Sequence, residues 1–415
     1  MDKHLLDIIE AIEMMLADFE PVEPMMVSVD RAIGLILAKD LIANIDLPWF
    51  TDSSMDGFAV KSEDICTANE LTPVELRVVA DIPAGTYFDG VINNGQAARV
   101  MTGGAIPAGA DSVVPVELTN IDYRHPGLSA TGTVLIYKSV VAGENVRKRG
   151  QDITSGQLIR QAGSILRPQD IGMLAVLGQP FVCAHRRPKI GVLSTGDEIV
   201  SPGEELQLGK IYDSNSYTLS ALAEQLGCDA IRLGIAVDRK DEIERYLDQA
   251  VEAGVDLIVS SAGVSVGAFD FVRSVIEEHG RINFWRVNMR PGKPLAYGNY
   301  RGVPIVGLPG NPVSAFIGFV VFVSPIIARL RGQLDWKRTI VRAILEEPVT
   351  SDGRESYLRS IVLEKRGKLY ARLTGHQGSG NLYSLVQANA LLIVPSEVKS
   401  LPIGAEIDAW MLSAT

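Results

Sequence analysis

Cysteine is scarce in this chain, which limits the scaffolds and sites that it can form. Among 415 residues there are three cysteines, Cys66, Cys183 and Cys228, without C-x-x-C spacing or a neighbouring histidine. This disfavours both a disulfide scaffold and a cysteine-based zinc site. We expect buried free thiols in a reducing compartment, and therefore a cytoplasmic protein.

The chain also lacks an excess of basic charge and any low-complexity segment. It has 39 lysines and arginines against 50 acidic residues, a net charge of −11 and a pI near 5.1. This balance argues against nucleic acid or an anionic membrane as the main partner, although it leaves room for a local cationic pocket. With 47% hydrophobic and 21% charged residues, the composition is typical of a soluble globular protein of two to four domains.

One stretch is apolar enough to suggest a membrane span. Residues 312–328 carry no charge over 17 positions, but this length is marginal for a bilayer and Pro325 interrupts it. Asn311 and Pro312 are typical of a helix N-cap and first helical residue. We expect a core helix, or one at a subunit interface, and no membrane span. The first 16 residues have amphipathic helical spacing and do not resemble a signal peptide.

The order of apolar runs and turn residues predicts a multidomain chain of α/β plus β class. Strand and helix patterns alternate over residues 179–330, which predicts a three-layer α/β domain on a mostly parallel sheet. Residues 46–144 are rich in β-branched residues, glycine and proline, and they predict a small β domain. Residues 331–415 again show short strands, typical of a C-terminal β barrel or sandwich.

A strand followed by small residues lies at the centre of the α/β region. Residues 256–259 form a short apolar run, and a segment rich in Ser, Ala and Gly separates them from a helical pattern over 269–279. Such a loop presents backbone amides at a helix N-terminus, where a phosphate or similar anion binds. Asp270 either caps this helix or binds a metal that faces the anion. The candidate anion-binding residues are Ser260, Ser261, Gly263, Ser265 and Gly267.

The same letters spell G-x-S-x-G, the nucleophile elbow of serine hydrolases, at Gly263, Ser265 and Gly267. Such an enzyme needs an acid and then a histidine downstream of the serine. His279 lies near the end of the helix that the loop itself begins and is poorly placed, which leaves His376. A motif of five residues arises often by chance, so this is the weaker interpretation.

Carboxylates follow three separate strands of the α/β region. Glu198 comes after the strand that ends in STGD, Asp238 ends LGIAVD, and Asp270 follows the small-residue loop. Open α/β sheets bind ligands at the carboxyl ends of their strands, so these side chains indicate a site. Asp56 in DSSMDG and Thr102 in MTGG are weaker candidates, because turn chemistry alone explains both.

Cationic residues and two Pro-Gly turns follow in the sequence. Arg290 and Lys293 flank the first turn, Arg286 precedes it, and the second turn brings Pro309 and Asn311 to a helix start. Carboxylates that hold a divalent cation, beside basic groups that hold phosphate, suit a metal-assisted reaction on a phosphoanhydride. Solvent-exposed salt bridges are the alternative.

Nine collinear segments resemble the molybdopterin molybdotransferase family, which includes MoeA and the gephyrin E domain. The match runs in order over nearly the whole chain. The segments are DSSMDGFAV, RVMTGGAIPAGADSVVPVE, GENVRKRGQD, GVLSTGDEIV, IYDSNSYTLSALAEQLG, SAGVSVGAFD, PGKP, LPGNPVSAF and GHQGSGNLYSLVQANALLIVP.

The resemblance implies a transferase of molybdenum cofactor biosynthesis. Such an enzyme inserts molybdate into adenylylated molybdopterin and releases AMP with the help of Mg²⁺. The implied catalytic residues are Asp56, Thr102, Glu198, Asp238 and Asp270, of which the last three also bind the metal. The implied substrate-binding residues are Ser260, Ser261, Gly263, Ser265 and Gly267 for the terminal phosphate, Arg286 and Arg290 for the oxyanion or substrate, Lys293, Pro309 and Asn311, and Arg354 and Ser379 for the pterin.

The chain departs from the family pattern at two places. Ala262 stands where the family usually has the first glycine of a pair, and alanine would strain the loop if that position needs a positive φ. Arg286 and Arg290 occupy positions that often hold lysine, and the planar guanidinium fits an oxyanion differently from an ammonium group. The choice between molybdate and tungstate remains open.

The resemblance also implies an assembly. Family members resemble elongated homodimers of four-domain subunits, and here residues 1–45 with 145–178 would form the elongated first domain. Asp56 and Thr102 would then act in trans, and other cofactor-biosynthesis proteins would be further partners. Two alternative functions remain: a molybdopterin adenylyltransferase of the same α/β fold, and a non-catalytic scaffold like gephyrin.

Overall fold

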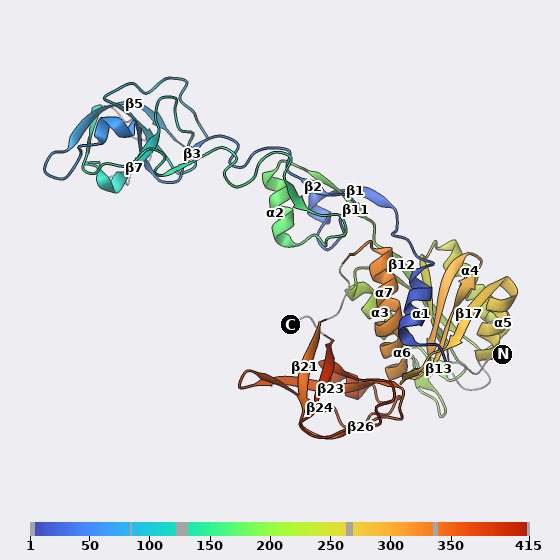
Figure 1. The fold of residues 1–415 in the computed structure, drawn as a ribbon. Coiled ribbons are helices and arrows are strands. Elements are labelled where there is room, and N and C mark those ends of the chain that lie inside the picture. The colour runs from blue at the N-terminus through green and yellow to red at the C-terminus, as the bar shows by residue number, and fades with distance from the viewer. Residues whose placement is uncertain (1–4, 84, 122–131, 263–268, 335–338, 413–415) are drawn as a thin grey trace. The chain divides into compact units, whose positions relative to one another are not determined.

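The computed structural model describes residues 5–83, 85–121, 132–262, 269–334 and 339–412, with the backbone alone at residues 262, 269, 270 and 285. The chain divides into two compact units (Figure 1). One unit comprises residues 40–161 with 176–178, and the other comprises residues 1–39, 162–175 and 179–415. Each unit contains its own hydrophobic core.

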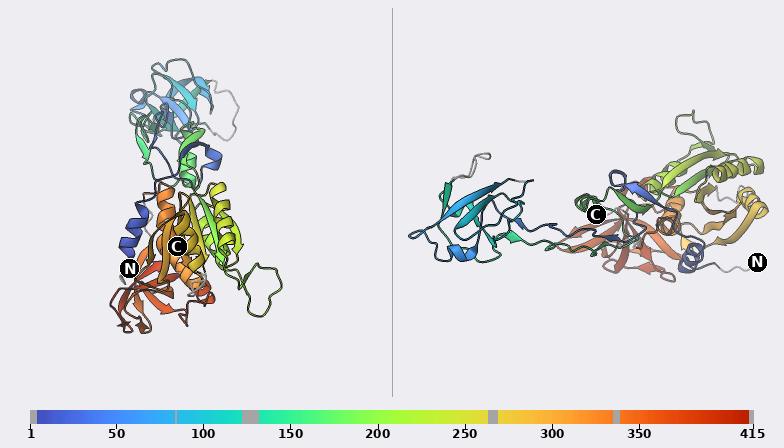
Figure 2. Two further views of the ribbon diagram at one scale, coloured as in Figure 1. Left: turned by 90° about the vertical axis from the view of Figure 1, so that its right-hand side faces the viewer. Right: turned by 90° about the horizontal axis from the view of Figure 1, so that it is seen from above.

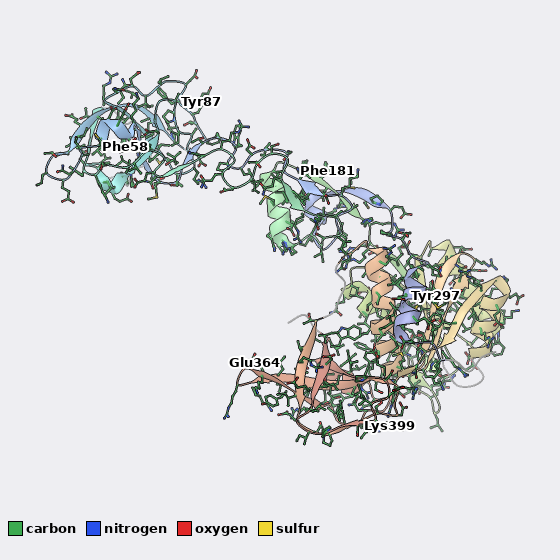
Figure 3. All side chains as sticks on the ribbon, viewed as in Figure 1. Phe58, Tyr87, Phe181, Tyr297, Glu364 and Lys399 are labelled. Carbon is green, nitrogen blue, oxygen red and sulfur yellow. The ribbon has the colours of Figure 1, made fainter. Side chains whose placement is uncertain are left out.

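The unit of residues 40–161 is built on a five-stranded sheet with the order β7-β4-β6-β5-β8. Phe58, labelled in Figure 3, packs with Leu76 and Val134 in its core. Gly57 is required because a Cβ there would lie 2.0 Å from the Val114 carbonyl oxygen. The strands are β4 (Gly57–Val60), β5 (Val74–Ile82), β6 (Gln96–Val100), β7 (Ser112–Pro115) and β8 (Gly132–Ile136), and the unit also holds two short pairs, β2 (Leu41–Ile42) with β10 (Leu158–Arg160) and β3 (Asp52–Ser53) with β9 (Val146–Arg147).

The other unit is centred on a six-stranded sheet with the order β15-β12-β16-β20-β19-β17. The first four strands are parallel, and β19 is antiparallel to both of its neighbours. This confirms the α/β class predicted from the alternating pattern. The strands are β12 (Lys189–Thr195), β15 (Asp229–Ala236), β16 (Leu257–Ala262), β17 (Gly280–Arg286), β19 (Pro294–Tyr300) and β20 (Val303–Pro309).

Helices cover both faces of this sheet (Figure 2). On one face, Val192 and Val259 pack with residues of α1 (Ile8–Leu16), α3 (Asn215–Gln225), α6 (Pro312–Gly318) and α7 (Ser324–Leu330). On the other face, Leu193 and Ile258 pack with α4 (Lys240–Glu252) and α5 (Phe269–His279). Apolar side chains therefore alternate between two cores along each central strand, as expected for a strand buried on both sides.

The uncharged run becomes the central helix of the protein. Helices α6 and α7 are joined by a π-helical turn at Phe319–Val323, which makes one helical stretch from Pro312 to Leu330. By length and composition this stretch could cross a membrane, but 83% of its most apolar window is buried inside the protein. The prediction of a core helix is confirmed.

Helix α1 packs on the α/β part of its unit. Its buried residues Ile8, Ala11 and Met15 belong to the core around α7. Beyond its end, Asp18 accepts a 2.8 Å hydrogen bond from the hydroxyl of Tyr297, which is labelled in Figure 3. From the sequence we assigned residues 1–45, which include this helix, to the elongated first domain, whereas its buried residues pack on the α/β core. The four domain boundaries themselves stay predictions.

Short elements link the N-terminal segment to the α/β core. They are β1 (Pro24–Ser28), which pairs with β11 (Phe181–His185), the 3₁₀ turn Val29–Arg31, and α2 (Pro168–Val176).

The C-terminal strands form a closed barrel. The ladder runs β23-β24-β21-β27-β25, and β25 pairs again with β23 to complete the ring. The barrel predicted for this region is confirmed. The strands are β21 (Ile340–Leu345), β23 (Glu355–Lys365), β24 (Lys368–Leu373), β25 (Ala390–Val394) and β27 (Glu406–Met411), accompanied by β18 (Met289–Arg290) on β23, the pair β22 (Val349–Thr350) with β26 (Ser400–Leu401), and α8 (Tyr383–Gln387).

Candidate functional site

The carboxyl ends of four parallel strands meet at one edge of the α/β sheet. Thr195 at the end of β12 is in register with Ala236 and Ala262, and Ala262 is in register with Pro309. The segments that carry Glu198 and Asp238 therefore begin at this edge, where the sequence placed them. Asp270 lies in the first turn of α5, and its side chain is outside the described part of the structure.

Asp238 sits in a strongly acidic environment. Burial raises the pKa of its carboxyl group, and the nearby Asp197 and Glu198 carboxylates raise it further. Its backbone amide donates a 3.1 Å hydrogen bond to Asp197 Oδ1, while its own Oδ1 is buried without a hydrogen-bond partner among the described residues. A group of this kind gains from a cation placed beside it. In the described residues, however, no three acidic, His or Cys side chains are already grouped as a metal site.

The Glu198 side chain folds back over Gly196 in the turn that follows β12. Gly196 has φ +146°, and a Cβ at this position would lie 2.7 Å from Glu198 Oε2. Glycine in the STGDE motif therefore lets the carboxylate approach the strand end.

A cleft of about 460 Å³ opens beside Glu198 on the α3 side of this edge. Its walls come from the β13 (Ile199–Val200) and β14 (Ile211–Tyr212) pair, the start of α3, the turn before α6, and Gly380 of the C-terminal region. Asn311 lines the cleft; it occupies the N-cap position of α6, as predicted, but its side chain makes no capping bond. Pro309 ends the adjacent strand β20.

Asn215 ties the walls of the cleft together. The amide nitrogen of this buried side chain donates to Ser261 Oγ at 2.6 Å and to the Gly310 carbonyl at 2.7 Å. Next to it, buried Asp213 accepts hydrogen bonds from the hydroxyls of Ser194 and Ser216. Neither Asn215 nor Asp213 was among the predicted site residues. The available signal was the run of polar residues in IYDSNS, directly before a helix.

The predicted cations Arg286, Arg290 and Lys293 lie outside the ion pairs of the described residues. Arg286 ends β17, which runs in the same direction as β20, so it reaches the same sheet edge. Within the described chain, Arg286, Arg290 and Lys293 form no ion pair with a carboxylate. Among the described residues, surface salt bridges therefore do not account for Arg286 and Lys293, whereas Arg290 interacts electrostatically with Asp352.

Arg354 and Arg290 are brought together where β18 pairs with β23. Arg354 donates to the Met289 carbonyl at 2.9 Å and pairs with Asp352 at 2.5 Å. The pKa of Asp352 is lowered, mainly by Arg354 and to a smaller extent by Arg290. Arg354 is thus largely occupied, which weakens its candidacy as a pterin contact.

Arg359 holds the C-terminal loop that reaches the cleft, and sequence reasoning missed it. Its side chain is 1% exposed, and its guanidinium donates to Ser384 Oγ at 3.0 Å and to the carbonyls of three consecutive residues, 376–378. Burial lowers the pKa of Arg359 to about 10. The loop continues to Ser379, whose carbonyl accepts a 3.1 Å bond from the Val313 amide, and then to Gly380 in the cleft wall.

Asp56 and Thr102 are in direct contact within the other unit. Asp56 Oδ1 accepts hydrogen bonds from the Thr102 amide at 2.6 Å and from the Thr102 hydroxyl at 2.7 Å. Asp52, four residues earlier, is instead buried in a bidentate pair with Arg147. The structure thus assigns Asp52 a structural contact and leaves the exposed Thr102 with Asp56 as the accessible pair.

Three family models match consecutive parts of this chain. The MoeA N-terminal region (domain I and II) matches residues 6–178, a probable molybdopterin binding domain matches 191–329, and the MoeA C-terminal region (domain IV) matches 342–412. A molybdopterin molybdenumtransferase of Haemophilus influenzae is 35% identical over 93% of both chains. The chain belongs to the MoeA family.

Other members of the MoeA family agree with this result. A protein of Nostoc sp. with the same name is 37% identical over 88% of this chain and 83% of its own. The crystal structure of a molybdopterin biosynthesis MoeA protein from Pyrococcus horikoshii has 32% identity and a TM-score of 0.85, and covers 99% of this chain and 100% of its own. The predicted family and fold class are confirmed.

The small-residue segment of this MoeA family member is partly strand. We had predicted a loop from Ser260 onward. That prediction is wrong for Ser260, Ser261 and Ala262, which lie in β16. Ala262 is paired on both sides in extended backbone, and no positive φ is required of it; the strain considered for it does not arise. Gly263, Ser265 and Gly267 lie outside the described residues, so their part in anion binding stays a prediction.

Proposed function

We propose that this chain is a molybdopterin molybdenumtransferase, which takes adenylylated molybdopterin and molybdate, leaves molybdenum bound by the dithiolene sulfurs, and releases AMP. The observation that carries the proposal is 35–37% identity, over 88–94% of the chain, to proteins of that name. The sheet edge with its carboxylates, free cations and cleft has the groups that such a reaction needs.

The substrates would be held by basic and polar groups of the α/β unit. Among the described residues Arg286 and Lys293 have no carboxylate partner, and Arg290 has only a minor influence on Asp352, so their charge is available to molybdate and phosphate. The pterin would enter the 460 Å³ cleft at Asn311. The loop that Arg359 holds brings Ser379 to the same wall, which supports Ser379 as a pterin contact.

Glu198, Asp238 and Asp270 would hold Mg²⁺ at the carboxyl edge. These are hard oxygen ligands of the kind that Mg²⁺ prefers, and the buried Oδ1 of Asp238 has no hydrogen-bond partner among the described residues. When bound, Mg²⁺ would offset the negative charge that develops on the phosphoanhydride and on departing AMP. Without a cation, burial and the nearby Asp197 and Glu198 carboxylates destabilise the ionised form of Asp238, and its pKa is therefore raised.

In the chemical step an oxygen of water or of molybdate would attack one phosphorus of the phosphoanhydride: a new P–O bond forms, the bridging P–O bond breaks, and AMP leaves with its electron pair. The two dithiolene sulfurs would replace one oxo ligand of molybdate, which leaves as water with the two thiol protons, so no oxidation state changes. Arg286 and Arg290 would stabilise the charge on the transferred oxygens, because guanidinium groups bind phosphate and similar oxyanions through paired N–H donors. The buried strand ends and the barrel loop would keep these groups in fixed positions, which lowers the entropic cost of bringing the substrates together.

We further propose a cytoplasmic homodimer in which Asp56 and Thr102 act on the site of the partner subunit. This part rests on the family resemblance and has a direct test. An Asp56→Asn chain mixed with an Asp238→Asn chain forms heterodimers with one intact site, so mixing equal amounts should restore about a quarter of wild-type activity. If both residues serve the same subunit, every site in the mixture carries a damaged residue and no activity returns.

The function itself is tested by incubating the purified protein with adenylylated molybdopterin, molybdate and Mg²⁺. AMP release that depends on molybdate, together with formation of active cofactor, would support the transferase. ATP consumption with adenylylation of molybdopterin would identify an adenylyltransferase instead. Binding without turnover of either substrate would indicate a scaffold.

A further inference from the structure

Three buried oxygen atoms without partners gather at the carboxyl edge of the sheet. Thr195 Oγ1, Ser260 Oγ and Asp238 Oδ1 each have no hydrogen-bond partner among the described residues. Thr195 and Ser260 are 0% and 1% exposed. Buried polar groups are nearly always paired, so a concentration of unpaired ones calls for an explanation.

Thr195 and Ser260 belong to the same face of the sheet, and Asp238 follows the end of the neighbouring strand β15. Side chains two residues apart along a strand point to the same side. Leu193 precedes Thr195 by two residues and Ile258 precedes Ser260 by two, and both lie in the core under α4 and α5. Ala236, which is in register with Thr195, belongs to that core and ends β15, and Asp238 lies in the bend directly after this strand. The opposite face is different, because there the hydroxyls of Ser194 and Ser261 are paired with Asp213 and Asn215.

The arrangement matches an acceptor with a donor. Asp238 Oδ1 can only accept a hydrogen bond when ionised, whereas the Thr195 hydroxyl can donate one and accept another. Thr195 ends β12 and Asp238 follows the end of β15; these two strands are neighbours, about 5 Å apart. Ser260 lies on β16, the neighbour of β12 on its other side, and it is in register with Leu193, two residues before Thr195. From there the Ser260 hydroxyl would donate the hydrogen bond that the Thr195 hydroxyl accepts.

An unpaired buried hydroxyl lowers the stability of the folded protein. An apolar group in place of the Thr195 or Ser260 hydroxyl would pack in the core without this loss of stability. Packing alone therefore does not explain why hydroxyls occupy these two positions. Proteins retain such costly groups mainly where they serve a site.

We propose that Thr195 is a positioning residue for the divalent-cation site: its hydroxyl, supported by Ser260, donates to one oxygen of Asp238 when the cation is bound to the other. The inference rests on the proposed function, since it assumes that Asp238 is a ligand. Groups that hydrogen-bond to a ligand fix its orientation, and their loss typically weakens metal affinity about 10- to 100-fold.

The test is titration of the purified protein with Mn²⁺ as the probe, followed by electron paramagnetic resonance, with and without 5′-AMP. Thr195→Val keeps the shape and removes the hydroxyl, and Thr195→Ser restores it. We expect Mn²⁺ affinity to fall by about tenfold or more in Thr195→Val and to stay within about twofold of wild type in Thr195→Ser. Ser260→Ala should have a smaller effect in the same direction.

Thermal unfolding of the metal-free proteins supplies a second readout. Thr195→Val should leave the melting temperature unchanged or raise it, because it removes an unpaired buried hydroxyl. The matched control is Ser220→Ala. Ser220 lies on α3, the helix that packs on the opposite face of the sheet, and its hydroxyl is also buried without a described partner. It should behave like Thr195→Val in unfolding but leave Mn²⁺ affinity unchanged.

Two results would overturn the inference in different ways. If wild type binds Mn²⁺, Asp238→Asn does not, and Thr195→Val binds like wild type, then the role of Thr195 is wrong and the metal site stands. If wild type binds no Mn²⁺ in either condition, the metal site itself is wrong and the inference falls with it.

Discussion

Asn215 donates hydrogen bonds from a single amide nitrogen to two segments that are far apart in sequence, at Ser261 Oγ and at the Gly310 carbonyl. It thereby joins the start of α3 to the end of β16 and to the turn before α6. These three segments meet at the predicted substrate cleft, so one buried amide determines the shape of the wall.

Removing this amide should therefore loosen the wall. We expect Asn215→Ala to lower the free energy of unfolding by about 1–3 kcal/mol, because Ser261 Oγ and the Gly310 carbonyl lose a buried partner. Urea unfolding measures the change. Asn94→Ala, at an exposed position in the other unit, is the control and should stay within about 0.5 kcal/mol of wild type. Equal losses in the two variants would contradict the role given to Asn215.

The contact between Thr102 and Asp56 predicts a loss of activity without a loss of fold. Thr102→Val removes the hydroxyl donor at 2.7 Å and leaves the amide donor, so the carboxylate keeps one of its two bonds. We expect the rate of AMP release to fall by at least about tenfold, because the variant loses one hydrogen bond to a charged acceptor. Thr102→Ser should retain most of the rate.

The control for this prediction is Thr86→Val in the same unit. The Thr86 hydroxyl donates to the Pro83 carbonyl in an exposed turn. Its loss should leave the rate unchanged. A Thr102→Val enzyme as fast as the Thr86→Val enzyme would show that the Asp56 contact is only part of a turn.

Arg359 should affect substrate binding through the loop that it holds. Lysine cannot reproduce the planar fork that reaches the carbonyls of residues 376–378, so Arg359→Lys should release the loop that carries Ser379. We expect KM for adenylylated molybdopterin to rise about tenfold while kcat changes less. Arg372→Lys, at an exposed position of β24, is the matched control. A fall in kcat with unchanged KM would argue against a positioning role.

The cysteines should differ sharply in reactivity. Burial raises the pKa of the Cys228 thiol to about 12, and the nearby Arg331 offsets only part of this effect. At pH 8 the thiolate that reacts with alkylating reagents is therefore almost absent from Cys228. The expectation of buried thiols holds for Cys228 but is wrong for Cys66, which is exposed, and Cys183 is only partly buried. Mass spectrometry after iodoacetamide treatment of the native protein should find Cys66 modified and Cys228 intact. Rapid modification of Cys228 before unfolding would contradict its burial.

The sequence predicted those features of the fold that depend on local patterns. The alternation of apolar runs and helical spacing was sufficient to predict the α/β region. The uncharged run after Asn311 was sufficient to predict the core helix. The carboxylates of Glu198 and Asp238 were predicted at the sheet edge because residues that follow parallel strands share that edge.

Features that depend on register or on distant contacts were not accessible. Arg354 and Arg359 are five residues apart in one arginine-containing stretch, and only the pairing of β23 in the barrel buries Arg359 and orients it toward residues 376–378. Asn215 bonds to residues 46 and 95 positions away. The packing of α1 on α7 likewise joins two helices that are far apart in the sequence, so it leaves no local signal.

The most direct test of the account is the dependence of AMP release on molybdate in a single-turnover experiment with adenylylated molybdopterin and Mg²⁺. Wild type should release AMP and yield active cofactor only when molybdate is present. Asp238→Asn should slow that release by about two orders of magnitude or more, as expected for loss of a group that binds the catalytic metal. AMP release at the same rate without molybdate, or a wild-type rate from Asp238→Asn, would contradict the central claim.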